Sequence, residues 1–303
     1  MPFNIVSYAG NAALLLAGLF LANCSRVESI QLGRESPPFG PFGAPHPLSE
    51  LGVPVQNPTL TGDLLEIYFT SNRTGSIGKN DTWVAKRTHV DEPFGTPELA
   101  PTVNSSSEES SPAISPDGLT LWFGSNRAGG MGGMDIWVST RPDRSSPWSE
   151  PKSATELNTP GYELPRPVGN HELQMPISSF ETGNNYQLRL TTRASVEGTW
   201  GSPVTISELA DAAVNRGDGF LSDDGATLLF NSEPPDSTTN EILRTWRLGS
   251  KDAFATAVPV GNGLTGNTLT RDPWLSADGA RFFFSSDRSG DWMAYEADLD
   301  NDR

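Results

Sequence analysis

The chain has 303 residues, of which 36% are apolar, 30 are glycine and 25 are proline, and this composition favours short strands and tight turns over helices. Its 37 acidic residues outnumber 21 basic ones, which gives a formal net charge of −16. A protein of this charge repels nucleic acid and anionic lipid headgroups, so neither is expected as a direct partner of the folded domain.

The first predicted element is an apolar run of eleven residues, AALLLAGLFLA at 12–22. A membrane-spanning helix needs about 20 residues, whereas this length is typical of a signal-peptide core. The run ends in Leu-Ala-Asn-Cys, which resembles the lipobox of bacterial lipoproteins, and Cys24 is the only cysteine. Asn23 departs from the usual Gly or Ala, and the leader has no Lys or Arg, so an ordinary secretory signal is the alternative.

We therefore predict a lipoprotein-type signal peptide over 1–23, a tether over 24–38 and one domain over 39–303. Lipidation of Cys24 would anchor the chain to the outer membrane, facing the periplasm or the cell surface. A secreted soluble protein is the alternative localisation.

A repeat of about 54 residues follows the leader. A serine at the end of a short apolar run recurs at steps of 54, 54, 53 and 54 residues. An aromatic residue, usually three positions before a proline, recurs at steps of 54, 52 and 54. The serines are Ser71, Ser125, Ser179, Ser232 and Ser286, and the aromatic residues are Phe94, Trp148, Trp200 and Phe254. Two independent markers with one period indicate five copies of one structural unit.

Each unit is predicted to contain three or four strands. In the second unit these are the apolar bursts at 119–123 and 134–141 and a proline-marked segment at 147–157, and Asp117-Gly118 favours a tight turn before the first burst. Such units are typical of propeller blades. The last unit lacks its aromatic–proline segment, but Phe42-Gly43-Ala44-Pro45 matches it at the other end of the chain. We predict an all-β, five-bladed β-propeller closed by an N-terminal strand.

The stretch at 115–138, SPDGLTLWFGSNRAGGMGGMDIWV, resembles the WD-like β-propeller repeat of TolB-type proteins. The matching residues are Ser115, Pro116, Asp117, Gly118, Ser125, Asn126 and Arg127. The resemblance covers about residues 40–300 and implies a secreted or periplasmic propeller that binds other proteins. The chain departs from TolB in having five repeats rather than six and in lacking an N-terminal α/β domain.

Arg127 and Asp135 lie eight residues apart across a glycine-rich turn, as do Arg73 and Asp81. The recurrence predicts a structural charge pair that pins the hairpin. Trp274 and Trp292 fall outside the repeated positions, so we expect them to be exposed.

One residue at the start of each predicted innermost strand is a candidate for ligand binding at the channel mouth. These residues are Asn57, Ser111, Arg166, Asp218 and Asp272. Two carboxylates near a cation could bind a small anion or a sugar, or a metal if Arg166 turned away. A water-filled channel lined with polar groups is one alternative. Catalysis is another, because five-bladed glycosidases use carboxylates from separate blades as acid and as base or nucleophile.

The sequence thus predicts a non-catalytic, monomeric envelope propeller that binds a protein or a glycan through loops on a rigid scaffold. It predicts no cofactor, because no phosphate-binding loop appears, and no structural metal site, because the three histidines have no ligand spacing and there is a single thiol. The alternatives are a glycoside hydrolase-like propeller and one that binds a small ligand or a metal in its central channel.

Overall fold

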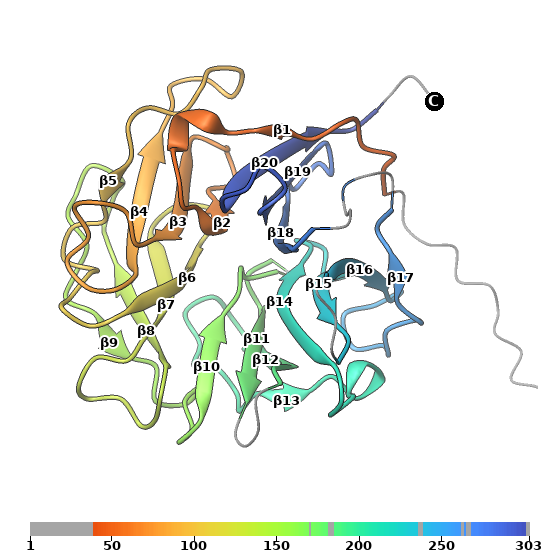
Figure 1. The fold of residues 1–303 in the computed structure, drawn as a ribbon. Coiled ribbons are helices and arrows are strands. Elements are labelled where there is room, and N and C mark those ends of the chain that lie inside the picture. The colour runs from red at the N-terminus through yellow and green to blue at the C-terminus, as the bar shows by residue number, and fades with distance from the viewer. Residues whose placement is uncertain are drawn as a thin grey trace, which may run out of the picture. The chain divides into compact units, whose positions relative to one another are not determined.

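The computed structural model describes residues 39–169, 171–180, 185–235, 239–261, 264 and 268–300. Their strands form five four-stranded antiparallel sheets around a common centre, so the predicted five-bladed β-propeller is confirmed (Figure 1). The predicted signal peptide, the tether and Cys24 lie outside the described residues. Among the described residues, no helix is long and apolar enough to cross a membrane.

In blades 1 to 4 the strands run in chain order from the centre of the ring outward (Figure 1). Blade 1 contains β2 (Gln56–Leu60), β3 (Glu66–Ser71), β4 (Asp81–Lys86) and β5 (Glu98–Leu99). Blade 2 contains β6 (Glu109–Ile114), β7 (Thr120–Ser125), β8 (Asp135–Thr140) and β9 (Lys152–Ser153). Blade 3 contains β10 (Tyr162–Pro165), β11 (Gln174–Phe180), β12 (Gln187–Thr192) and β13 (Val204–Thr205). Blade 4 contains β14 (Asn215–Leu221), β15 (Thr227–Glu233), β16 (Glu241–Trp246) and β17 (Val258–Pro259).

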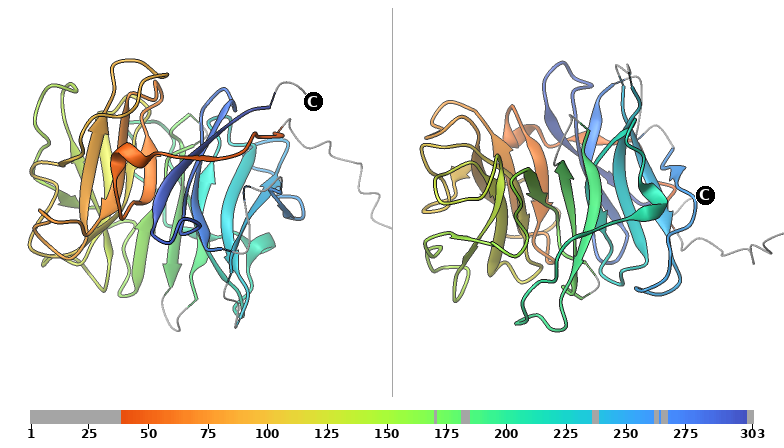
Figure 2. Two further views of the ribbon diagram at one scale, coloured as in Figure 1. Left: turned by 45° about the horizontal axis from the view of Figure 1, so that its top comes forward. Right: turned by 90° about the horizontal axis from the view of Figure 1, so that it is seen from below.

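Blade 5 is built from both ends of the described chain. It contains β18 (Thr270–Leu275), β19 (Arg281–Ser286) and β20 (Met293–Asp298), and its outermost strand is β1 (His46–Pro47), which pairs with β20. The left view of Figure 2 shows the orange N-terminal segment beside the blue C-terminal strands. Gly43 and Leu48 extend the pairing, because their amides donate to the carbonyls of Asp298 and Ala294 at 2.8 and 2.9 Å. The predicted closure of the ring by an N-terminal strand is confirmed, and it pairs an edge that would otherwise be open.

The Ser-x-Asp-Gly motif forms the turn between the first and second strands. The Ser115 hydroxyl donates to Asp117 Oδ1 at 2.6 Å, and the same carboxylate oxygen accepts the amide of Leu119 at 2.9 Å. Gly118 has φ +75°, a conformation that a side chain disfavours. The same hydroxyl–carboxylate contact recurs at Ser222–Asp224 and Ser276–Asp278, so the motif is a repeated turn.

The predicted pairing of Arg127 with Asp135, and of Arg73 with Asp81, is wrong. Arg127 Nε donates to Ser125 Oγ at 3.1 Å, and the guanidinium lies 5.0 Å from the ring centroid of Phe123. Asp135 instead accepts the amides of Met131 and Gly132 in the glycine-rich turn. Blade 1 has the same arrangement, because Arg73 donates to Ser71 Oγ while Asp81 accepts the amides of Ile77 and Gly78. Asn126 joins the two inner strands, because its Oδ1 accepts the amide of Glu108 at 2.9 Å.

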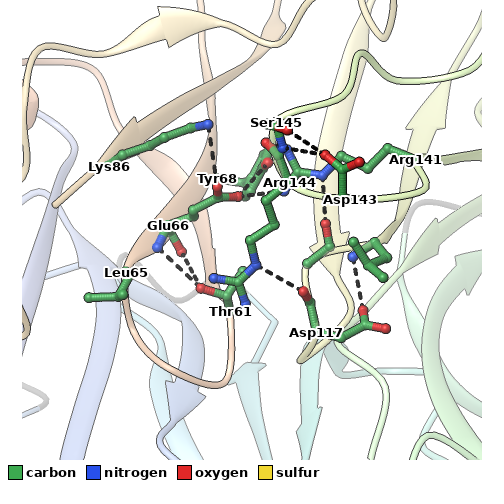
Figure 3. Close-up of polar contacts among 12 residues, drawn as sticks. Thr61, Leu65, Glu66, Tyr68, Lys86, Asp117, Arg141, Asp143, Arg144 and Ser145 are labelled. Carbon is green, nitrogen blue, oxygen red and sulfur yellow. Dashed lines mark hydrogen bonds and ion pairs between the residues drawn. The ribbon is translucent and has the colours of Figure 1, made fainter. Parts of the chain in front are cut away.

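The repeated aromatic residue packs against an arginine that follows the third strand of its blade. The pairs are Arg87–Phe94, Arg141–Trp148, Arg193–Trp200 and Arg247–Phe254, with guanidinium-to-centroid distances of 4.3, 4.4, 4.3 and 4.4 Å. In blade 2 this arginine also reaches the preceding blade, where Arg141 Nη2 lies 2.6 Å from Glu66 Oε2. Figure 3 shows these two side chains next to each other. The aromatic residue therefore recurs at this spacing because it forms a cation–π contact within its blade. At Arg141 the same guanidinium also contacts the neighbouring blade.

Candidate functional site

Four of the five predicted channel residues have a left-handed backbone. Asn57, Ser111, Asp218 and Asp272 have φ values of 52°, 51°, 54° and 59°, and each lies in a bulge that interrupts the pairing of its innermost strand. Asn and Asp tolerate this conformation better than most residues, which explains part of the residue choice. Arg166 differs, because it follows β10 and its amide bonds regularly to the carbonyl of Pro176 at 3.1 Å.

In two blades the residue that precedes the marker serine accepts the bulge amide of the next blade. Thr70 Oγ1 accepts the amide of Ser111 at 3.1 Å, and Ser178 Oγ accepts the amide of Asp218 at 2.9 Å, in both cases from the preceding blade. Ser285 instead donates to the Asp272 carboxylate within blade 5, at 2.8 Å. These small polar residues recur in step with the marker serines, so the repeat itself is the sequence signal by which they could have been found.

Asp272 is the centre of the polar contacts. Its carboxylate accepts the Asn57 amide at 3.0 Å, the Asn57 side-chain amide at 2.6 Å and the Ser285 hydroxyl, and Arg166 Nη1 lies 3.5 Å away. An ionised carboxylate has about four lone-pair sites, so these donors saturate it. The Asp272 side chain is only 2% exposed and joins blades 1, 3 and 5. Its contacts give Asp272 a structural role, because they hold these three blades together.

Arg166 bridges the two carboxylates predicted for the channel. It forms an ion pair with Asp218 as well as with Asp272, and its Nε donates to Ser178 Oγ at 3.2 Å. Burial raises the pKa of Asp218 to about 6; Arg166 opposes that effect, while the charge of Asp272 reinforces it. The structure therefore brings Asn57, Arg166, Asp218 and Asp272 into direct contact.

A polar pocket of about 190 Å³ lies where the innermost strands begin, and Ser111 lines it together with the other four predicted residues. Its further lining includes residues that were not predicted from the sequence: Tyr186, Asn215, Asn231, Glu233 and Arg271. Three buried polar atoms at this pocket make no hydrogen bond with the protein: Ser111 Oγ, Asn231 Oδ1 and Arg271 Nε. These three atoms have almost no accessible surface, so the groups that the pocket presents are the partly exposed Asn57, Asn215 and Glu233, which suit a hydroxyl-rich ligand or ordered water.

The donor set of this pocket does not resemble a metal centre. Within the part of the chain that the structure describes, no group of three His, Cys, Asp or Glu side chains could hold a metal ion. Arg166 occupies the space between the two carboxylates that a cation would need. The pocket is thus built for hydrogen bonding.

No family model matches the sequence, and no curated protein matches it. Among solved structures, the chain is similar to the α-L-arabinofuranosidase PaAbf62A from Podospora anserina, with 13% identity, 84% of this chain and 95% of that chain covered, and a TM-score of 0.53. The endo-arabinase from Bacteroides thetaiotaomicron matches with 12% identity, 84% and 96% coverage and a TM-score of 0.53. TolB from Agrobacterium tumefaciens matches with 14% identity, 77% and 70% coverage and a TM-score of 0.47. Likeness at these identities extends to the propeller fold alone.

Proposed function

We propose that the chain is a non-catalytic binding propeller of the bacterial cell envelope, which takes a sugar unit of a glycan in the polar pocket. The observation that carries this proposal is the polar lining of a space of about 190 Å³, to which the partly exposed side chains of Asn57, Asn215 and Glu233 contribute. They offer amide donors, amide acceptors and a carboxylate, and the hydroxyls of a polyhydroxylated ring can pair with all three kinds of group. The volume corresponds to about six water molecules, which is of the order of one sugar ring.

The placement in the envelope rests on the sequence. The apolar run at 12–22 and the lipobox-like residues before Cys24 support a lipoprotein exported to the outer membrane. A protein partner is the other expected class of ligand for such a scaffold, and it would contact the loops around the ring.

A hydrolase is the second candidate, and the raised pKa of Asp218 favours it, because a carboxyl that titrates near 6 can act as a general acid. Two observations weigh against it. The Asp272 carboxylate is already saturated by donors from Asn57, Ser285 and Arg166. Arg166 also pairs with both carboxylates, which leaves neither available as a base.

Calorimetric titration with a panel of monosaccharides and envelope oligosaccharides tests the proposal, alongside an assay for new reducing ends. We expect saturable binding without turnover. Ser111→Val should weaken binding, and Ser145→Ala, at an exposed turn, is the matched control. Binding that ignores Ser111→Val would exclude the pocket, and turnover that is lost in Asp218→Asn would establish the hydrolase instead.

A further inference from the structure

The opposite end of the central channel holds a second and larger space, which we call the apolar cavity. It has a volume of about 500 Å³ and lies where the innermost strands end. Every blade contributes to its lining, through Leu60, Ile114, Val168, Phe220 and Trp274. A volume of this size is within the range of about 300–1,000 Å³ that small-molecule sites occupy.

The apolar cavity is separate from the polar pocket. Between the two lies only a small space of about 10 Å³, which Arg166, Asp218 and Asp272 help to line. A space this small admits at most one water molecule. A ligand of the apolar cavity therefore enters from its own mouth and is independent of the glycan proposed above.

Aromatic side chains give this cavity much of its apolar character. Phe39, Phe220 and Trp274 line it, and the rings of Phe220 and Trp274 lie 5.9 Å apart. Trp274 is 6% exposed, so the prediction that it is exposed is wrong; it packs between Phe220 and Phe283 instead. Two neighbouring aromatic rings and the aliphatic side chains of Leu60, Ile114 and Val168 suit an apolar body of some length.

The mouth of the cavity is acidic. Asp223, Asp224 and Asp278 line it, all three are exposed, and no Lys or Arg is among the lining residues. Hydrogen bonds from Ser276 and the Ala280 amide lower the pKa of Asp278, so it is ionised at neutral pH. Asp223 already contacts His171 at 3.2 Å, which leaves Asp224 and Asp278 as the carboxylates that a ligand would meet first.

We propose that the apolar cavity binds an amphiphilic organic cation, with its apolar body between Phe220 and Trp274 and its ammonium group at Asp224 and Asp278. The charge at the rim excludes an anionic amphiphile, such as a fatty acid. The net charge of −16 adds a long-range preference of the same sign.

Three probes that differ only in their head group test this proposal on the mature protein: 4-phenylbutylamine, 4-phenylbutanol and 4-phenylbutyrate. Calorimetry should show that the amine binds about fivefold more tightly than the alcohol, as expected for two exposed carboxylates, and that the acid binds least. Added salt should reduce the difference. Equal binding of the three probes, or no binding of the amine, would overturn the proposal.

Two variants place the binding in this cavity. Asp224→Asn with Asp278→Asn should make the amine and the alcohol bind alike, while Asp143→Asn, at an exposed turn of blade 2, should change nothing. Ala277→Trp should block all three probes, because Ala277 is exposed at the mouth and a larger side chain there does not enter the core. Amine binding that survives Ala277→Trp, or a head-group preference that survives the double variant, would place the probe elsewhere.

Discussion

Replacing Arg166 with methionine tests whether the guanidinium holds the channel together. The Arg166 side chain is 6% exposed and pairs with Asp218 and Asp272, which are 14% and 2% exposed. Methionine fills similar space but leaves two adjacent carboxyls in the interior without their cation. Removing one partner of a buried ion pair costs about 3–5 kcal/mol, so we expect Arg166→Met to lose that much stability at pH 8.

The same variant should be much less destabilised at low pH. Burial raises the pKa of Asp218 to about 6, so at low pH Asp218 takes up a proton and only one of the two buried charges is left without its cation. Urea unfolding, followed by tryptophan fluorescence at pH 8 and pH 5, measures both losses. Arg166→Met combined with Asp218→Asn should recover part of the stability at pH 8, because one buried charge has been removed.

Two results would refute this reasoning. An equal loss at both pH values would mean that Arg166 acts through packing alone. A double variant less stable than Arg166→Met would mean that Asp218 contributes something other than its charge.

Three further predictions concern groups with defined neighbours. The folded-state pKa of Asp218 is raised above 3.8 to about 6, so the unfolding free energy of the wild type minus that of Asp218→Asn should fall as the pH rises from about 4 to about 6. Burial alone would raise the pKa of Glu66, but Arg141 holds it below its usual range. Urea titrations should therefore show Glu66→Gln costing about 3 kcal/mol at pH 7 and progressively less below pH 4.5, the usual value for this group. Gly118→Ala should lower the melting temperature more than Gly279→Ala. Both glycines have positive φ, but a Cβ at Gly118 would lie 2.7 Å from Arg144 Nε, whereas a Cβ at Gly279 would meet nothing within 4 Å.

The fold could be predicted from the sequence because its information is periodic. The spacing of about 54 residues indicates five blades. The aromatic–proline segment that begins at Phe42 indicates the strand that closes the ring. What spacing does not encode is the direction of a side chain beyond the end of a strand. Arg127 lies two residues past Ser125 and its guanidinium lies over the ring of Phe123, whereas Asp135 accepts the amides of the turn. A separation of eight residues is compatible with both arrangements.

The candidate site was predictable as a set of positions but not as a network. Counting from the start of each innermost strand identified five residues that line one pocket. The left-handed backbone of the bulges could not be predicted, because the residue types at these positions allow positive φ but do not require it. The positions are Asn57, Ser111, Asp218 and Asp272. The bridging role of Arg166 depends on contacts across 52 and 106 residues of chain, which no local pattern carries.

The closure of blade 5 makes the order of the blades cyclic. Phe42 bridges to Leu299, and the amide of Asp300 donates to the carbonyl of Pro41 at 2.8 Å, so the first and last described segments are neighbours. A short linker between them, with a cut in the loop between β9 and β10, would yield a circular permutant that keeps all five sheets. Blade 5 would then be a continuous piece of chain, and the permuted chain would begin with blade 3. No blade is first in this architecture, which is the arrangement expected of a ring assembled by copying one unit.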